Sequence, residues 1–162
     1  MSDKTLVVYF TWSGTSKKAA EWIKEELGTD IFEIKTIKKY SDKYAVCIGQ
    51  AGMEKMQKTR PELVSYLDTV SEYEKIVIVS PNWWSSLPMA VAGFLERYNF
   101  TGKKIYPVCM HGGGGVAKTV TTMKNICQGA EFAQELVLNG KKIDLPETKE
   151  AVITLCEQIK KS

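Results

Sequence analysis

Histidine, paired cysteines and long apolar runs are scarce in this sequence. His111 is the single histidine among 162 residues, so a histidine-based metal site is excluded and a Ser-His hydrolase would depend on this one side chain. The four cysteines lie far apart, without any C-x-x-C spacing, at Cys47, Cys109, Cys127 and Cys156. We therefore predict no disulfide framework and no metal site, and we expect the cysteines to be small buried hydrophobic residues.

Signals for export or membrane insertion are also missing from the sequence. No apolar stretch approaches the ~20 residues that a membrane-spanning helix needs. Near the amino terminus, Lys4 is followed only by the short apolar run 6–10 before polar residues resume, which is unlike a signal peptide. We expect a cytoplasmic protein without a membrane partner.

An excess of one charge sign is absent as well, because the formal net charge is only +3. The basic residues are distributed through the chain rather than gathered in one long patch. Short basic runs such as Lys38-Lys39 and Lys160-Lys161 are typical of solvated surfaces. This pattern argues against nucleic acid as the main partner.

The chain does have enough apolar material for one core. It contains 44% hydrophobic residues over 162 positions, which suffices for an ordinary domain without disulfide or metal support. No internal repeat, low-complexity tract or linker interrupts it. We predict a single domain over residues 1–162.

Short apolar runs rich in β-branched and aromatic residues alternate with segments of helical period. This alternation predicts an α/β fold, a three-layer αβα sandwich around a five-stranded parallel sheet. The continuously apolar runs Leu6–Phe10 and Ile76–Val79 are typical of central strands buried on both faces. The other predicted strands are Ile31–Ile34, Ile105–Cys109 and a weaker run from Phe132 to Leu138, after which Asn139-Gly140 is expected to turn the chain.

Apolar stripes at helical spacing predict helices between these strands. The stripes are Ala19-Ala20-Ile23-Leu27, stopped by Gly28; Val91-Phe94-Leu95-Tyr98; Val116-Val120-Met123-Cys127; and Ala151-Val152-Leu155-Cys156-Ile159. Gly49 and Gly52 weaken a helix over Tyr44–Met56. Pro61 suits the first turn of a short helix that would carry Leu63, Leu67 and Val70.

Ligands of open α/β sheets bind beyond the carboxyl ends of the strands, so the loops after the predicted strands are informative. The first loop has four hydroxyls, one glycine and no charge, in the order Thr11, Trp12, Ser13, Gly14, Thr15, Ser16. Hydroxyls and backbone N–H groups at a helix N-terminus form a cradle for a phosphate group. The alternative is an ordinary N-cap with additional Ser and Thr residues.

The second loop, after the run 76–79, holds adjacent tryptophans within Ser80-Pro81-Asn82-Trp83-Trp84-Ser85-Ser86-Leu87-Pro88. Neighbouring residues cannot both face one core, so at least one indole is expected to be exposed or stacked on an aromatic ligand. The alternative places one tryptophan under the loop and the other at an oligomer interface.

The third loop, Met110-His111-Gly112-Gly113-Gly114-Gly115, carries four consecutive glycines. Their conformational entropy cost is understandable if the backbone must approach a ligand closely, and a merely flexible loop is the alternative. A single loop histidine such as His111 is more often a surface residue than a catalytic one.

Together these loops resemble the flavodoxin family, in particular its short flavodoxin-like branch. The family pattern T/S-x-T/S-G-x-T/S is met by Thr11, Ser13, Gly14 and Ser16, and the segment 77–84 is similar to the family's strand that ends before one or two tryptophans. Arg60-Pro61-Glu62-Leu63 also resembles a segment of the short branch. The resemblance implies the strand order 2-1-3-4-5 and bound flavin mononucleotide (FMN), with the first loop on the phosphate, Trp83 against the isoalloxazine ring and the loop from His111 as a third flavin contact.

The resemblance assigns all candidate site residues to cofactor binding and none to catalysis or to a metal. They are Thr11, Trp12, Ser13, Gly14, Thr15, Ser16, Pro81, Asn82, Trp83, Trp84, His111, Gly112, Gly113 and Gly114. Ser80 departs from the glycine that the family often has there. At +3 the chain also departs from the acidic flavodoxins, whose charge guides them to basic partners.

The expected function is electron transfer through FMN, with redox proteins or small electron acceptors as partners and a monomer or weak dimer as the assembly. An FMN-dependent NAD(P)H:quinone-type reductase is the first alternative, although G-x-G-x-x-G is absent. A non-redox module that binds a partner through Trp83-Trp84 is the second. The sequence lacks residues that a receiver domain, a low-molecular-weight phosphatase and a P-loop nucleotidase each require. For example, Ser13-Gly14-Thr15 has no lysine where a P-loop needs one.

Overall fold

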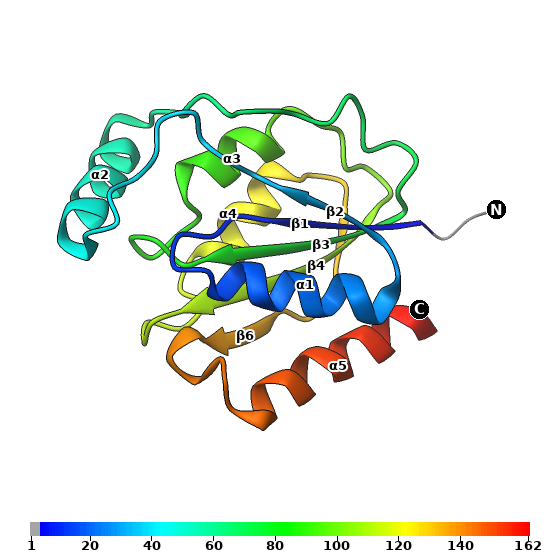
Figure 1. The fold of residues 1–162 in the computed structure, drawn as a ribbon. Helices are drawn as coiled ribbons and strands as arrows, with labels where there is room; N and C mark the ends of the chain where they lie inside the picture. The colour runs from blue at the N-terminus through cyan, green and yellow to red at the C-terminus, as the bar shows by residue number, and fades with distance from the viewer. Residues whose placement is uncertain (1–3) are drawn as a thin grey trace.

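The apolar runs of the sequence form one parallel sheet, described by a computed structural model over residues 4–162. The strands are β1 Thr5–Tyr9, β2 Asp30–Glu33, β3 Lys75–Pro81, β4 Lys104–His111, β5 Glu131–Phe132 and β6 Leu136–Asn139. Their order is β2-β1-β3-β4-β5, with β6 also paired to β4, and every pairing is parallel. The predicted α/β class and strand order are confirmed (Figure 1).

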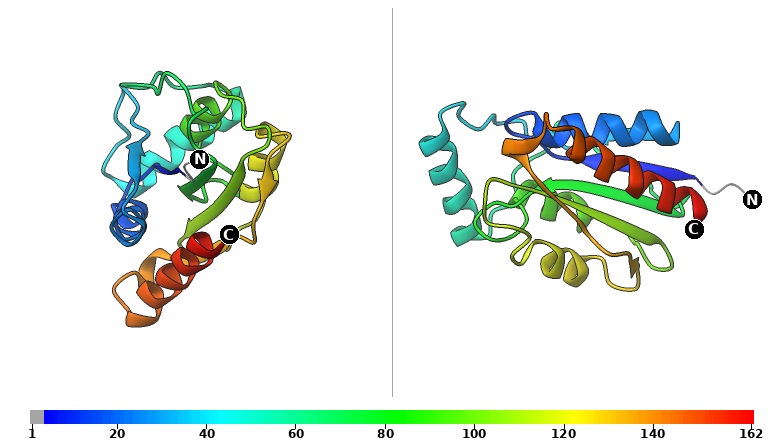
Figure 2. Two further views of the ribbon diagram at one scale, coloured as in Figure 1. Left: turned by 90° about the vertical axis from the view of Figure 1, so that its right-hand side faces the viewer. Right: turned by 90° about the horizontal axis from the view of Figure 1, so that it is seen from below.

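Side chains of the central strands alternate between two apolar cores, because successive residues of a strand point to opposite faces. Leu6 and Val8 of β1 pack in one core with α3 Met89–Leu95 and α4 Thr119–Ile126. Val7 packs in the other core with α1 Thr15–Leu27 and α5 Pro146–Lys161. Figure 2 shows these helix pairs on opposite faces of the sheet, which is the predicted sandwich.

The helix α2, Tyr44–Gln57, occupies a different place from the others. It stands at the end of the molecule toward which the strand arrows point (Figures 1 and 2). The weakening effect of Gly49 and Gly52 therefore does not prevent this helix. Gly28 ends α1 in a left-handed conformation, φ 61°, as predicted.

The fifth predicted strand, Phe132 to Leu138, is split into β5 and β6, so that prediction is wrong in detail. The N–H of Ala133 donates to Ile105 O at 2.9 Å. The next bond of this ladder would need an N–H at Pro107, and proline has none. Residues 133–135 leave the ladder there, and pairing resumes between Val108 and Leu136.

Three helix predictions are also corrected. The segment after Pro61 is not helical, although Leu63 and Val70 are buried as expected. Its backbone is satisfied by tertiary bonds instead: Val64 N–H donates to Lys35 O, and the Tyr98 hydroxyl bonds both backbone groups of Leu67. Helix α4 begins at Thr119, so Val116 lies before it. Helix α3 ends at Leu95 and leaves Tyr98 beyond its last turn.

Within residues 4–162, no helix is long and apolar enough to cross a membrane.

Candidate functional site

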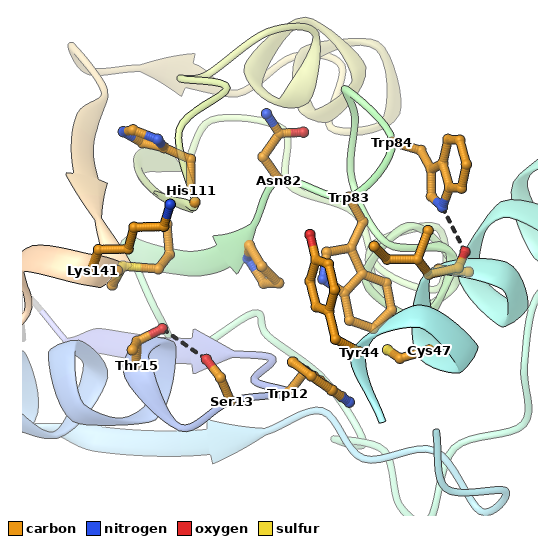
Figure 3. A pocket seen from close by; sticks show the side chains of 16 residues that line it. Trp12, Ser13, Thr15, Tyr44, Cys47, Asn82, Trp83, Trp84, His111 and Lys141 are labelled. Atoms are coloured by element: carbon orange, nitrogen blue, oxygen red, sulfur yellow. Dashed lines mark hydrogen bonds between the residues drawn. The ribbon is translucent and has the colours of Figure 1, made fainter. Parts of the chain in front are cut away.

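A cavity of about 630 Å³ lies at the carboxyl ends of the strands, where the three predicted loops meet α2 and the turn after β6 (Figure 3). Its volume falls in the ~300–1,000 Å³ range of small-molecule sites. Nine predicted site residues line it: Trp12, Ser13, Thr15, Pro81, Asn82, Trp83, Trp84, His111 and Gly112. Thr11, Gly14, Ser16, Gly113 and Gly114 do not.

The hydroxyls of the first loop do not cap helix α1. Gly14 is the N-cap of α1, with φ 99°, and no side chain caps the helix. The Thr11 hydroxyl instead accepts from Gly14 N–H at 2.9 Å, which tightens the turn. Ser16 is buried, while Ser13 and Thr15 hydroxyls lie 3.2 Å apart on the cavity surface. These two hydroxyls and the first N–H groups of α1, which have no partner within the helix, are available to an anion.

A lysine that sequence analysis did not identify stands at the same end. Lys141 follows β6 and is the one charged side chain among the cavity-lining residues. It is placed there by a 3-10 turn, Gly140–Lys142, whose N–H at Lys141 donates to Asn139 Oδ1. Gly140 lies close enough to Thr15 that a Cβ there would stand 3.4 Å from the Thr15 hydroxyl. Figure 3 shows Ser13, Thr15, His111 and Lys141 on one side of the cavity.

The other side of the cavity is aromatic. Trp83 is held edge-on by Phe10 and Tyr40, with ring centroids at 5.3 and 5.1 Å. The ring centroids of Tyr44 of α2 and Trp12 lie 6.0 Å apart. The Trp12 indole N–H donates to Ser41 O at 2.8 Å. The cavity is therefore divided into a polar half with one cation and an apolar half with several ring faces or edges.

Trp84 connects the second loop to α2. Trp83 and Ser86 exchange two backbone hydrogen bonds of 2.9 and 3.0 Å, so Trp84 and Ser85 form a two-residue hairpin turn. Both have positive φ, 52° and 63°, a conformation that costs side-chain-bearing residues energy. The Trp84 indole at this turn reaches α2, where its N–H donates to Ile48 O at 2.8 Å.

The third loop is tied to the second through Asn82. Its side-chain amide donates to Gly115 O at 2.8 Å, and its backbone N–H donates to Met110 O at 2.9 Å. Gly113 and Gly115 have φ 138° and 70°, so at least two of the four glycines are required by backbone conformation. His111 Nδ1 accepts from Gly113 N–H at 2.9 Å, which places the proton of the neutral ring on Nε2.

Burial keeps the α2 side of the cavity uncharged. It raises the pKa of the Cys47 thiol above its ordinary value, with a further increase from Glu54. Burial also raises the pKa of Tyr40, whose hydroxyl donates to Glu54. Burial likewise raises the pKa of Glu54, against the opposing effect of that hydrogen bond. The Cys47 thiol lines the cavity and stays protonated, which suits an uncharged, aromatic ligand, whereas Tyr40 and Glu54 are not among the cavity-lining residues.

The residues missed by sequence analysis come mainly from α2 and from the last loop. They are Tyr44, Cys47, Ile48, Ala51, Met110, Gly140 and Lys141. Lys141 could have been found, because it follows the predicted fifth strand and its Asn139-Gly140 turn. The residues of α2 carry no such signal, since nothing in their spacing says that this helix closes the end of the sheet.

Comparison with known proteins places the chain among flavoproteins. A family model described as Flavodoxin matches residues 4–157. No curated protein matches the sequence significantly. A crystallised candidate flavoprotein from Bacteroides uniformis ATCC 8492 is 27% identical with a TM-score of 0.80, covering 97% of this chain and 99% of that one.

Two further structures share the fold at lower identity. A flavoprotein in complex with FMN from Lactobacillus acidophilus NCFM is 22% identical, with a TM-score of 0.69 over 88% of this chain and 97% of that one. Oxidised Flavodoxin 2 from Bacillus cereus is 19% identical, with a TM-score of 0.65 over 98% of both chains.

Proposed function

The chain belongs to the flavodoxin family, and from this premise we propose that it binds FMN in the cavity of Figure 3 and serves as an electron-transfer protein. The observation that carries the proposal is the division of one cavity into an anion-binding half and an aromatic half. FMN has a phosphate at one end and an isoalloxazine ring at the other. The anion-binding half matches the phosphate, and the aromatic half matches the isoalloxazine ring.

The phosphate end would be held by the first loop. The hydroxyls of Ser13 and Thr15 would donate to phosphate oxygens, together with backbone N–H groups at the start of α1, where the helix dipole also favours an anion. Lys141 supplies the single positive charge at this end. Thr11 acts indirectly, because its bond to Gly14 N–H keeps the turn in shape.

The ring end would be held by Trp12, Tyr44 and Trp83. Trp83 is immobilised by Phe10 and Tyr40, so its indole is positioned before the ligand arrives and little side-chain entropy is lost on binding. The bound flavin supplies the redox chemistry, accepting and releasing one or two electrons. The protein supplies position and a wall of low polarity, and no side chain is required as an acid, base or nucleophile.

A titration of apoprotein with FMN tests the binding step. We expect quenching of flavin fluorescence at one FMN per chain, and retention of the yellow colour on dialysis. Trp83→Leu is expected to weaken binding about tenfold or more, since stacking of an aromatic base on such a side chain contributes ~1–3 kcal/mol. Trp22→Leu, outside the cavity, is the matched control. Unquenched flavin, or equal losses in both variants, would contradict the proposal.

A second measurement separates a carrier from a reductase. The FMN-loaded protein, reduced by dithionite without oxygen, is expected to pass its electrons to an added redox protein. Steady-state turnover with NADPH and a quinone is expected to remain at background. Sustained turnover in that assay would make the protein a self-sufficient oxidoreductase instead.

A further inference from the structure

The outer face of α2 is apolar and exposed. Val46, Met53 and Met56 are 49%, 59% and 84% exposed, and their spacing places them on one side of the helix. Ile37, 59% exposed, lines a groove of about 380 Å³ together with Met53. We call Ile37, Val46, Met53 and Met56 the α2 patch. Exposed apolar side chains gathered in this way are typical of a binding surface.

The opposite face of the same helix lines the candidate FMN cavity, through Cys47, Ile48 and Ala51. Figures 1 and 2 show α2 at the end of the molecule, with one side toward the strand ends and the other facing away. A molecule seated on the α2 patch would be separated from the cavity by one helix, a thickness of ~10 Å. The patch is therefore placed for electron exchange with the cavity.

Positive charge is concentrated around the α2 patch. Residues 35–60 contain seven basic and two acidic side chains, a net charge of +5, although the whole chain carries only +3. Lys35 and Arg60 are paired with Glu33 and Glu96 outside this segment, and Glu54 and Glu62 line the groove with Lys38 and Lys39, so the excess at the patch comes from the remaining lysines. Lys39 lines the groove beside Ile37, Lys43 precedes α2 and Lys58 ends it. The basic residues that look dispersed in the sequence are thus partly gathered beside the cavity, and the remainder of the chain has a net charge of −2.

We infer that the α2 patch is the docking surface for a small acidic electron-transfer protein of the ferredoxin type. This inference rests on the proposed function. A positive rim steers an acidic partner and fixes its orientation, while a small apolar centre excludes water. Transient redox complexes use small interfaces, below ~1,200 Å². A second copy of this chain is disfavoured, because two segments of the same positive charge would face each other.

Binding of an acidic plant-type [2Fe–2S] ferredoxin, labelled with a fluorophore, tests the inference by anisotropy with both apoprotein and FMN-loaded protein. Lys39→Glu combined with Lys43→Glu is expected to weaken binding at least tenfold at low ionic strength. Lys24→Glu combined with Lys161→Glu changes the net charge equally, on α1 and α5, and is expected to change binding less than twofold. Met53→Ser combined with Met56→Ser is expected to weaken binding while leaving its salt dependence unchanged.

Several outcomes would overturn the inference. Equal losses in the two charge variants would show that only net charge matters, and no binding by the wild type would remove the surface altogether. Sedimentation of the protein with phosphatidylglycerol vesicles, or self-association abolished by the Met53→Ser, Met56→Ser variant, would assign the patch to a lipid surface or to a second copy. If the protein binds ferredoxin through the patch but does not bind FMN, the proposed function fails and the docking surface stands.

Discussion

At the scale of single residues, Lys141 supplies the one charged side chain that lines the cavity. The first loop contains no charge, so an FMN phosphate held there by hydroxyls and N–H groups alone would keep its negative charge close to the ring. Lys141 approaches this end from the turn after β6, far away in the sequence. Its ammonium group offsets part of that charge. The first loop itself is therefore uncharged, but in the folded protein the phosphate end of the cavity also contains the positive charge of Lys141.

Lys141→Met is expected to weaken FMN binding about fivefold, which corresponds to ~1 kcal/mol for a charge-assisted contact at an exposed position. Riboflavin has no phosphate, so its affinity is expected to stay within a factor of two. Fluorescence titrations at low and high salt measure both ligands. Lys142→Met is the matched control, because Lys142 is exposed and does not line the cavity. Equal losses for FMN and riboflavin would show that Lys141 acts on the fold rather than on the phosphate.

At the scale of elements, α2 is docked through a glycine. A Cβ at Gly52 would stand 2.8 Å from two ring carbons of Trp84, which is closer than such atoms can approach. The glycine that weakens the helix in isolation therefore permits the contact that holds it. The Lys55 ammonium, which donates to Trp84 O, strengthens the same junction.

Gly52→Ala is expected to lower the free energy of unfolding and to weaken FMN binding, because either α2 or the Trp84 ring must move. Gly49→Ala is the control in the same helix, since a Cβ there meets no atom within 4 Å. Alanine is the better helix former, so this variant is expected to gain up to ~1 kcal/mol. Urea unfolding measures both. A gain in both variants would mean that the Trp84 contact does not hold α2.

The segment after α2 is joined to α3 by an ion pair. Arg60 binds both carboxylate oxygens of Glu96, at 2.8 and 3.0 Å, and its stem lies against Gly93, where a Cβ would stand 3.3 Å from it. The bond from Arg60 lowers the pKa of the Glu96 carboxyl. A carboxyl with a lowered folded-state pKa stabilises the protein above its unfolded pKa, and this contribution is lost as pH falls through the folded pKa.

Glu96→Gln is expected to cost less than ~1 kcal/mol at pH 7, because both side chains are about 40% exposed and solvent screens the pair. The difference from wild type is expected to shrink below the ordinary Glu pKa of ~4.3 and to be lost as pH falls through the lowered folded-state pKa of Glu96. Urea unfolding at several pH values measures it. Glu131→Gln is the control, because Glu131 is exposed on β5 and forms no ion pair within residues 4–162. A cost that does not change as pH is lowered would assign the effect to packing.

At the scale of the whole molecule, the sheet could be predicted from the sequence, but the position of α2 across the carboxyl ends of its strands could not. Continuous apolar runs such as Ile76–Val79 identify strands directly, since only a strand covered on both faces needs them. The split of the fifth strand depends on Pro107 in the neighbouring strand, which is a partner effect that no local pattern contains. The segment after Pro61 failed as a helix for a similar reason, because distant groups such as Tyr98 satisfy its backbone.

The candidate site also has a part that could be predicted from the sequence and a part that could not. Strand-end loops are found by their place in the sequence, and the residues Trp12, Asn82 and His111 do line one cavity. The wall formed by α2 depends on where the chain returns after β2, and the Trp84 contact that directs it needs two residues with positive φ. Sequence patterns indicate which helices and strands form, whereas the wall formed by α2 depends on how that helix packs against the rest of the protein.

Stability is expected to be uneven across the molecule as a consequence. Helix α5 buries five of its sixteen side chains, whereas α2 buries only Cys47 and Ala51 of fourteen. Local opening free energies follow buried apolar contact, so the amide hydrogens of α2 are expected to exchange fastest among the helices of the apoprotein. FMN would contact α2 through the cavity and add the contacts that this helix lacks.

Hydrogen exchange followed by mass spectrometry, with and without FMN, measures this difference. Protection on binding is expected to be largest in α2 and in the loops around Ser13 and Gly113, and smallest in α5, whose contacts do not depend on the ligand. Riboflavin is expected to protect α2 but not the first loop, because it lacks the phosphate. Uniform protection of all helices would mean that the ligand stabilises the molecule only globally, and that α2 is not a separately mobile wall of the site.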